Sequence, residues 1–282
     1  MAVRDLQSDL QFALGLADLA DEMSMDAFHA GSVRHSIKSD GTPTIHVEVA
    51  IEDAVRNALT RFRPMDGFVG EESGQSGDPS ACWIIDPIDG TKDFIKGEAA
   101  WATQIAFRLN GDLTLGVTSA PALGGRWWGA VGHGSWMSNN HSGGRPSKVV
   151  STDRKERLRW SCHPALDALG TDWYRIASAL RAIGDYVAPD PHAVLMVIEG
   201  QIEVALQLEG AAWDYAAFAA IVSASGGRFS YLDSSIEMRG VRPALFTNGI
   251  AHDGALHALA EGRTGCHLKG TMSNPELCGP TA

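Results

Sequence analysis

Residues 83–91 read Trp-Ile-Ile-Asp-Pro-Ile-Asp-Gly-Thr. The apolar run 83–85 predicts a buried strand, and two aspartates, a glycine and a threonine follow it closely. A carboxylate at the end of a buried strand is costly unless it meets a cation. The backbone N–H groups and the hydroxyl of Gly90-Thr91 suit a phosphate. The stretch therefore predicts a divalent-metal site beside a phosphate-binding loop, with metal-assisted phosphoryl transfer to water as the reaction class.

Two further acidic stretches lie where predicted elements begin or end. Gly70-Glu71-Glu72-Ser73 follows a short predicted strand, and Trp213-Asp214 precedes an Ala-rich helix. Taken singly, a Glu-Glu pair is usually a solvated loop and an Asp before a helix is usually its N-cap. Mg²⁺ is a hard ion that takes oxygen ligands, which several carboxylates and a backbone carbonyl would supply. The joint occurrence of the three stretches favours one shared metal site.

Composition excludes several classes of function. The 282 residues include 34 acidic and 23 basic side chains, a formal net charge of −11, and no basic run, which argues against a nucleic-acid partner. No stretch approaches the ~18–20 apolar residues of a membrane helix, and the N-terminus lacks a signal-peptide pattern. The four cysteines form no CxxC pair, so we expect reduced thiols and a cytoplasmic location. They are Cys82, Cys162, Cys266 and Cys278.

Periodicity predicts an alternating arrangement of helices and strands. Helical spacing covers residues 5–31 and 47–63, strands are expected at 68–70 and 82–85, and a turn at 38–43. A strand meander is expected over 101–136, and a chain boundary at 139–148. The expected elements after it are helices at ~172–182, ~191–200 and ~214–226 and strands at ~202–207 and ~228–232. This alternation indicates an α/β fold, with parts at 1–145 and 146–262 and a flexible tail at 263–282.

The motifs Gly-Glu-Glu-Ser, Trp-Ile-Ile-Asp-Pro-Ile-Asp-Gly-Thr and Trp-Asp-Tyr-Ala-Ala, in this order, resemble those of the inositol monophosphatase family. The resemblance runs from about residue 6 to about residue 258. It implies a layered α-β-α-β-α sandwich, a homodimer, and a magnesium-dependent, lithium-sensitive phosphomonoesterase acting on a small phosphorylated alcohol. It also implies two or three Mg²⁺ ions per site, with Mn²⁺ as a substitute.

Positions carried over from the family give a set of site residues. The implied metal ligands are Glu71, Asp86, the Ile88 carbonyl, Asp89 and Asp214. The implied phosphate contacts are Asp89, Gly90 and Thr91, and the implied catalytic residues are Glu48, Thr91 and Glu71. In this assignment the Thr91 hydroxyl helps to orient the attacking water. The implied substrate contacts are Asp185, Tyr186, Gln207 and Asp214.

Within the family, the chain is most similar to histidinol-phosphate phosphatases of the actinobacterial type. Trp101-Ala102-Thr103, the stretch 121–128 (Pro-Ala-Leu-Gly-Gly-Arg-Trp-Trp) and Gly184-Asp185-Tyr186 carry this similarity. A carboxylate at Asp185 would favour an ammonium-bearing substrate by charge pairing in a partly dry pocket. The alternative is that Asp185 caps or turns the chain.

The chain departs from the family pattern at three places. Glu48 stands where the family has an aspartate, which adds one methylene, and the adjacent His46 is expected at the surface because Mg²⁺ prefers oxygen. The loop 186–192 is longer than its counterpart and holds two prolines. Gln207 replaces a glutamate that often faces the substrate. These changes leave the identity of the substrate alcohol undecided.

Three readings of the activity follow. Histidinol phosphate leads as substrate. An inositol, amino-cyclitol or sugar phosphate of a specialised pathway is the alternative, since an amino-cyclitol would satisfy Asp185 as well. A catalytically impaired family member with a binding role is the non-enzyme alternative, although Glu71, Asp86, Asp89, Thr91 and Asp214 are all present.

Overall fold

The structure is a computed structural model that describes residues 4–31, 35–37, 41, 43–139, 143–150, 157–232 and 243–261. The described chain divides into two compact units. Unit 1 is drawn from Met1–Pro146 and Ala212–Ile221, and unit 2 from Ser147–Ala211 and Val222–Ser273, as far as these ranges are described. Each unit is considered by itself.

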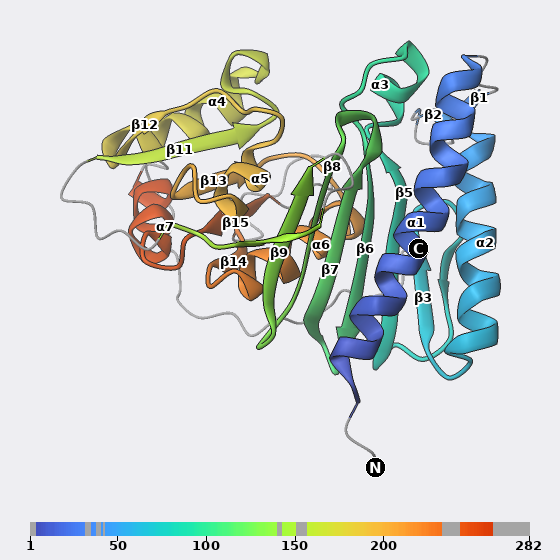
Figure 1. The fold of residues 1–282 in the computed structure, drawn as a ribbon. Coiled ribbons are helices and arrows are strands. Elements are labelled where there is room, and N and C mark those ends of the chain that lie inside the picture. The colour runs from blue at the N-terminus through green and yellow to red at the C-terminus, as the bar shows by residue number, and fades with distance from the viewer. Residues whose placement is uncertain are drawn as a thin grey trace. The chain divides into compact units, whose positions relative to one another are not determined.

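Unit 1 is built on an eight-stranded sheet with the strand order β10-β9-β8-β7-β6-β5-β3-β4 (Figure 1). The pair β3·β5 is parallel, whereas β3·β4, β5·β6, β6·β7, β7·β8 and β8·β9 are antiparallel. The strands are β3 (Gly67–Gly70), β4 (Gly74–Ser76), β5 (Ala81–Asp89), β6 (Ala102–Leu109), β7 (Asp112–Ala120), β8 (Gly125–Ala130), β9 (Gly134–Asn139) and β10 (Arg145–Ser147). A two-stranded sheet pairs β1 (His35–Ile37) with β2 (Pro43–Ile45).

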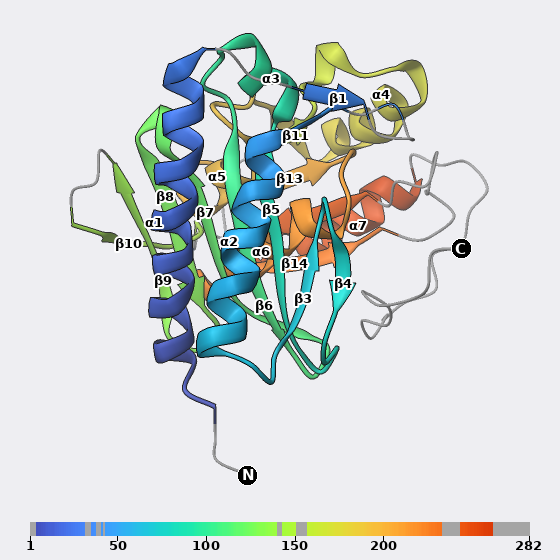
Figure 2. The same cartoon turned by 90° about the vertical axis from the view of Figure 1, so that its right-hand side faces the viewer.

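Two long helices, α1 (Leu6–Ala30) and α2 (His46–Phe62), lie side by side on one face of this sheet (Figures 1 and 2). The Asp5 side chain caps α1 by accepting from two backbone N–H groups, and Gly31 ends the helix with a positive φ of 66°. The apolar faces of α1 and α2 pack with Trp83, Ile85 and Phe107 in the main core cluster of unit 1. Burial of this apolar surface holds the two helices on the sheet.

The opposite face of the sheet is covered by α6 (Ala212–Ala224), whose first residues belong to unit 1. Successive side chains of a strand point to opposite faces, so Ile84 packs with Ala216 and Ala217 of α6 while its neighbours face α1 and α2. A Cβ on Gly116 of β7 would lie 2.4 Å from the Ala217 carbonyl oxygen, so glycine is needed for this approach. By the same alternation Asp86 lies on the α6 side.

Unit 2 holds a five-stranded sheet of order β12-β11-β13-β15-β14. Its strands are β11 (Leu158–His163), β12 (Gly184–Tyr186), β13 (Val204–Gln207), β14 (Arg228–Tyr231) and β15 (Ala244–Thr247), and its helices are α4 (Thr171–Ser178), α5 (Ala193–Ile198) and α7 (His252–Glu261). The β12-β11-β13 part is parallel, and β15 is antiparallel to both its neighbours. Its core gathers Trp160 and Cys162 of β11 with Ala255 and Leu259 of α7.

The α/β layered fold expected from the sequence is confirmed, and the differences are local. The expected strand 82–85 continues to Asp89 as β5, with an irregular register between Asp86 and Asp89. The expected helix 191–200 is shorter, because His192 caps α5 with its side chain and Glu199 ends it. The expected part 146–262 differs from the observed division, since Ala212–Ile221 groups with unit 1.

Some expectations fall outside the described residues. They include most of the turn at 38–43 and the tail at 263–282 with Cys266, His267 and Cys278. Cys82 and Cys162 are described, and both are buried and form no disulfide with a described residue.

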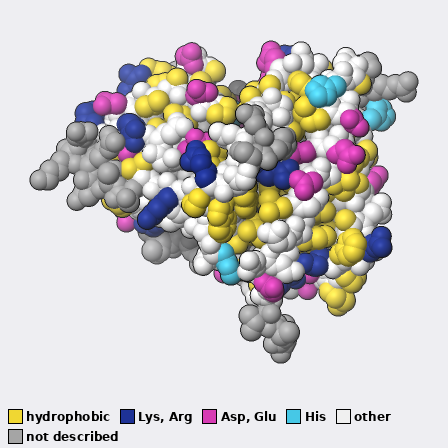
Figure 3. Space-filling model, in the orientation of Figure 1, with side chains coloured by type: hydrophobic (Ala, Val, Ile, Leu, Met, Phe, Trp, Pro, Cys, Tyr) yellow, Lys and Arg dark blue, Asp and Glu magenta, His cyan; other side chains and the backbone are white. Residues whose placement is uncertain are grey.

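The surface of the described residues mixes charges of both signs. On the face shown in Figure 3, acidic and basic side chains are interspersed, and the described basic side chains gather into no continuous patch there. No described helix combines the length and the apolar character needed to cross a membrane.

Candidate active site

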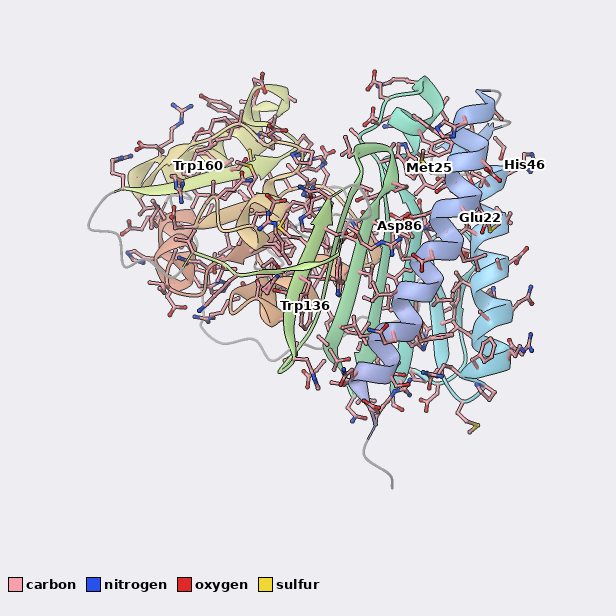
Figure 4. All side chains as sticks on the ribbon, viewed as in Figure 1. Glu22, Met25, His46, Asp86, Trp136 and Trp160 are labelled. Atoms are coloured by element: carbon pink, nitrogen blue, oxygen red, sulfur yellow. The ribbon has the colours of Figure 1, made fainter. Side chains whose placement is uncertain are left out.

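Three aspartates of unit 1 form a compact acidic cluster. Asp86 and Asp89 come from the end of β5, and Asp214 comes from the first turn of α6. One carboxylate oxygen of each lies within 4.8 Å of the others. Figure 4 labels Asp86 among the strands of unit 1. Because hard divalent cations take several carboxylate oxygens, these donors fit a Mg²⁺-type ion.

Hydrogen bonds orient the two aspartates of β5. The Ile88 backbone N–H donates to Asp86 Oδ1 at 3.0 Å, which folds the irregular end of the strand around that carboxylate. Gln104 Nε2 on β6 donates to Asp89 Oδ2 at 3.3 Å, and Thr118 of β7 donates to Gln104 Oε1 at 2.7 Å. This chain of partners runs across three neighbouring strands, so the sheet itself sets the direction of Asp89.

Burial and mutual repulsion raise the pKa values of Asp86 and Asp89. Burial raises the pKa of Asp86 well above its ordinary value, and repulsion from Glu71, Asp89 and Asp214 adds to this effect. Burial also raises the pKa of Asp89 to about 6, although the Gln104 hydrogen bond opposes the shift. Neither Asp86 nor Asp89 forms an ion pair with any residue that the structure describes. A bound divalent cation would relieve this repulsion.

Glu71 lies at the end of β3, the parallel neighbour of β5. Its backbone N–H donates to the Ile85 carbonyl oxygen at 3.3 Å, next to Asp86 in the chain. Glu71 also repels both Asp86 and Asp89 strongly enough to raise the pKa of each. The structure therefore brings this sequence-predicted ligand close to the aspartate cluster.

Gly90 and Thr91 join β5 to the short helix α3 (Thr91–Lys96). Gly90 has a φ of 94°, and a Cβ there would lie 2.7 Å from the Ala100 carbonyl oxygen, so both conformation and space require glycine. The Thr91 hydroxyl lies 2.6 Å from Glu48 Oε1 and 3.2 Å from the Ile88 carbonyl oxygen. The first N–H groups of a helix have no partner within it, so this turn can offer donors to an anion.

Glu48 is placed by the start of α2. Its Oε2 accepts from the Ile45 backbone N–H at 2.8 Å and from the Thr44 hydroxyl at 3.1 Å, as the glutamate of a capping box does. Its other oxygen reaches Thr91. The extra methylene relative to the family's aspartate is thus accommodated by folding back onto the helix start. The neighbouring His46 is exposed, and Figure 4 shows it on the outer helix α2.

The pKa of Glu48 is raised to about 7, chiefly by burial of its side chain. The hydrogen bonds from Thr91 and Ile45 lower it, and repulsion from Glu72 and Glu71 raises it further. A carboxylate with a pKa near neutrality can take up a proton during turnover. Glu48 is therefore a buried carboxylate with a pKa near neutrality, hydrogen-bonded to the Thr91 hydroxyl.

These raised pKa values predict how stability depends on pH. Because Glu48 and Asp89 titrate near 7 and 6 when folded, the folded protein holds protons that the unfolded chain has lost. Raising the pH through this range therefore lowers the stability of the metal-free protein. We expect its Tm to fall between about pH 5 and pH 8, and added Mg²⁺ to reverse the fall at pH 8. Thermal melts with EDTA and with Mg²⁺ at both pH values test this, and superimposable melts at pH 8 would contradict it.

Asp185 lies on β12 of unit 2, where its carboxylate is exposed. Its side chain is 68% exposed, and it forms an ion pair with Arg157 at 2.8 Å. Asp185 pairs with Arg159 in the β12·β11 register, whereas Gln207 pairs with His163 in the β13·β11 register. The two sequence-predicted contacts therefore differ by four residues along β11, about 13 Å at strand spacing. Within unit 2, Asp185 is thus an exposed residue of the edge strand β12, and its contact with the substrate stays a prediction.

Tyr186 and Gln207 are better enclosed than Asp185. The Tyr186 hydroxyl oxygen accepts from the Leu166 backbone N–H at 2.9 Å, and its ring packs on Trp160. Gln207 is 3% exposed, and its Oε1 has no hydrogen-bond partner among the described residues. The loop that starts at Tyr186 ends on His192, whose ring contacts that of His163 in a tilted arrangement, with centroids 4.3 Å apart.

Comparison with known proteins identifies the family. The sequence profile described as "Inositol monophosphatase family" matches residues 5–264. The chain belongs to the inositol monophosphatase family. A histidinol-phosphatase from Mycobacterium tuberculosis is 37% identical over 264 residues, covering 90% of this chain and 98% of the relative. A histidinol-phosphatase from Streptomyces coelicolor is 35% identical, and the match covers 90% of this chain and 95% of the relative. The fold is similar to that of the extragenic suppressor protein SuhB from Bartonella henselae, with a TM-score of 0.74 and 20% identity. The match covers 92% of this chain and 100% of that protein.

Several residues that support the site were not predicted from the sequence. Gln104 and Thr118 lie in predicted strands. A polar residue within an otherwise apolar strand was the one feature that could have indicated their role. Thr44 precedes α2 and holds Glu48. Their partners lie far away in the chain, so spacing alone could not pair them.

Proposed function

We propose that the protein is a Mg²⁺-dependent phosphomonoesterase that hydrolyses a small phosphorylated alcohol. The observation that carries this proposal is the cluster of Asp86, Asp89 and Asp214 beside the Thr91–Glu48 hydrogen bond. Membership of the phosphatase family supports the same activity. The three aspartates would hold the metal, with Glu71 and the Ile88 carbonyl as further proposed ligands. The bound metal would supply charge stabilisation and activation of water.

The chain's own residues then have defined roles. The backbone N–H groups at Gly90 and Thr91 would bind the phosphate oxygens. Because the Thr91 hydroxyl donates its proton to Glu48, its oxygen lone pairs are directed to accept from the attacking water. The proton lost by the water passes to Thr91 Oγ1 as the Thr91 proton passes to Glu48. The start of α2 orients Glu48 for this step.

Histidinol phosphate is the leading substrate. Two relatives named histidinol-phosphatase cover nearly the whole chain at 35–37% identity, which supports this choice. An inositol, amino-cyclitol or sugar phosphate is the alternative, favoured by the longer loop 186–192. Asp185, Tyr186, Gln207 and Asp214 stay predictions for contacts with the alcohol part. The non-enzyme alternative, a binding protein, predicts phosphate release at the buffer rate with every ester.

The deciding experiment is Mg²⁺-dependent phosphate release from four esters under the same conditions: histidinol phosphate, inositol 1-phosphate, an amino-cyclitol phosphate and a nucleotide monophosphate. A kcat/KM for histidinol phosphate at least about tenfold above the others would support the leading substrate. Preference for another ester would assign the alternative. We also propose a homodimer and a cytoplasmic location, to be tested by light scattering and cell fractionation.

The exposed position of Asp185 predicts a small effect of its substitution. Exposed ion pairs contribute about 0–1 kcal/mol, so Asp185→Asn should raise KM for amine-bearing esters by at most about fivefold. KM for inositol 1-phosphate should not change. Steady-state kinetics on both esters provide the measurement. An equal loss on the two esters would remove Asp185 from substrate recognition.

A further inference from the structure

Helix α2 carries a second buried carboxylate, Glu52, one turn after Glu48. Glu52 is 1% exposed, and it forms no ion pair with any described residue. Its Oε1 accepts from the Glu72 backbone N–H at 2.7 Å, and its Oε2 accepts from the Ser73 backbone N–H at 3.0 Å and from the Ser73 hydroxyl. Burying a carboxylate without a neighbouring cation costs free energy. The hydrogen bonds that Glu52 accepts from the turn at Glu72 and Ser73 offset this desolvation cost.

The turn that Glu52 holds follows Glu71 directly. Before this turn, the Glu71 N–H is bound to the Ile85 carbonyl oxygen of β5 at 3.3 Å. After it, the Glu72 N–H is bound to Glu52. Glu71 is therefore fixed on both sides, once by the strand that carries Asp86 and once by α2.

Gly70 shows how closely Glu52 approaches this chain segment. A Cβ at residue 70 would lie 2.5 Å from the Glu52 carboxylate. Real Cβ atoms do not come so close, so any larger side chain at this position would displace the carboxylate from its donors. Because Gly70 has no side chain, the Glu52 carboxylate can occupy the space beside it.

We infer that Glu52 is a positioning residue for the metal site, because it sets the placement of Glu71 relative to Asp86 and Asp89. The inference rests on the proposed function. Residues four apart lie on the same face of a helix, so α2 presents both Glu48 and Glu52 to the sheet. Glu48 holds Thr91, and Glu52 holds the turn after Glu71. One helix thereby sets the spacing between the water-orienting pair and a metal ligand.

A positioning role and a merely structural role make different predictions. A structural anchor affects the free energy of unfolding and leaves the metal affinity of the folded protein unchanged. A positioning residue changes the affinity for the ion, and loss of such partners typically costs about 10–100-fold in metal binding. Metal affinity of the folded chain is therefore the readout that separates them.

The test is the substitution Glu52→Gln in the full chain. Glutamine keeps the size and one acceptor oxygen, but its NH₂ group faces one of the donor N–H groups. The matched control is Asp53→Asn, the same charge change at the next, exposed residue of α2. Mn²⁺ binding is measured by calorimetry, and the Mg²⁺ concentration for half-maximal phosphate release is measured alongside.

We expect Glu52→Gln to raise the Kd for Mn²⁺ by about tenfold or more. The half-maximal Mg²⁺ concentration should rise in parallel, kcat at saturating Mg²⁺ should stay within about threefold of wild type, and Asp53→Asn should leave both unchanged. If the wild type binds Mn²⁺ and Glu52→Gln binds it equally well, the inference is overturned while the proposed function stands. If the wild type itself binds no Mn²⁺ and releases no phosphate, the proposed function fails first.

Should Glu52→Gln not fold, Ser73→Ala takes its place. It removes the hydroxyl donor and keeps both backbone hydrogen bonds. One lost hydrogen bond predicts a Kd for Mn²⁺ about two- to fivefold higher. An unchanged Kd in this variant would overturn the inference.

Discussion

Asp89→Asn is expected to abolish phosphate release while leaving the fold intact, with kcat falling on the order of 10³-fold or more. Asparagine has the same shape and can still accept from Gln104. It lacks the negative charge that Asp89 contributes to the cluster with Asp86 and Asp214. The variant should also melt at the same or a higher temperature than wild type without metal, because one repelling charge is gone.

Phosphate release with saturating Mg²⁺, thermal melts with EDTA and circular dichroism measure these effects. The matched control is Asp93→Asn, the same substitution one turn into α3, where Asp93 pairs with Lys96 at 3.1 Å. That variant should keep activity within about threefold of wild type, since an exposed ion pair contributes little. Near-normal turnover in Asp89→Asn would remove the metal assignment.

Glu48→Gln is expected to lower kcat by about 10²–10³-fold, with a smaller effect on KM. Glutamine cannot take up the proton that the Thr91 hydroxyl delivers at 2.6 Å. The wild-type rate should fall as the pH drops through the pKa of Glu48, about 7 in the metal-free protein and lower beside a bound cation. Glu48→Gln should not show this fall in rate at low pH. Rates from pH 5 to pH 9 give the measurement.

The matched control is Glu48→Asp, which keeps the charge and restores the residue of the family pattern. We expect it to be active, since a carboxylate in the same place can still act on Thr91. A folded but inactive Glu48→Asp would show that the longer arm, which also reaches Ile45 and Thr44, is required. Full activity of Glu48→Gln would exclude Glu48 as the base.

Much of the site was predictable because its motifs are local. The strand before Asp86, the glycine at Gly90 and the threonine at Thr91 are neighbours in sequence, and their chemistry already indicates a metal beside a phosphate. The helices α1 and α2 were predictable from apolar spacing for the same reason. The extension of β5 through Asp89 was not, because a Pro within the run normally argues against a central strand.

The sequence by itself determined the fold class and the family, and it pointed to Asp86, Asp89 and Asp214 as residues that could hold a cation. Only the tertiary structure decided which carboxylates meet and which stay apart. Asp214 joins Asp86 because α6 packs on the face of the sheet to which Asp86 points. Asp185 is exposed beside Arg157, and the Glu52 carboxylate reaches the Glu72 N–H because Gly70 has no side chain in its way. These outcomes depend on contacts between segments distant in the chain, and local pattern carries no information about such contacts.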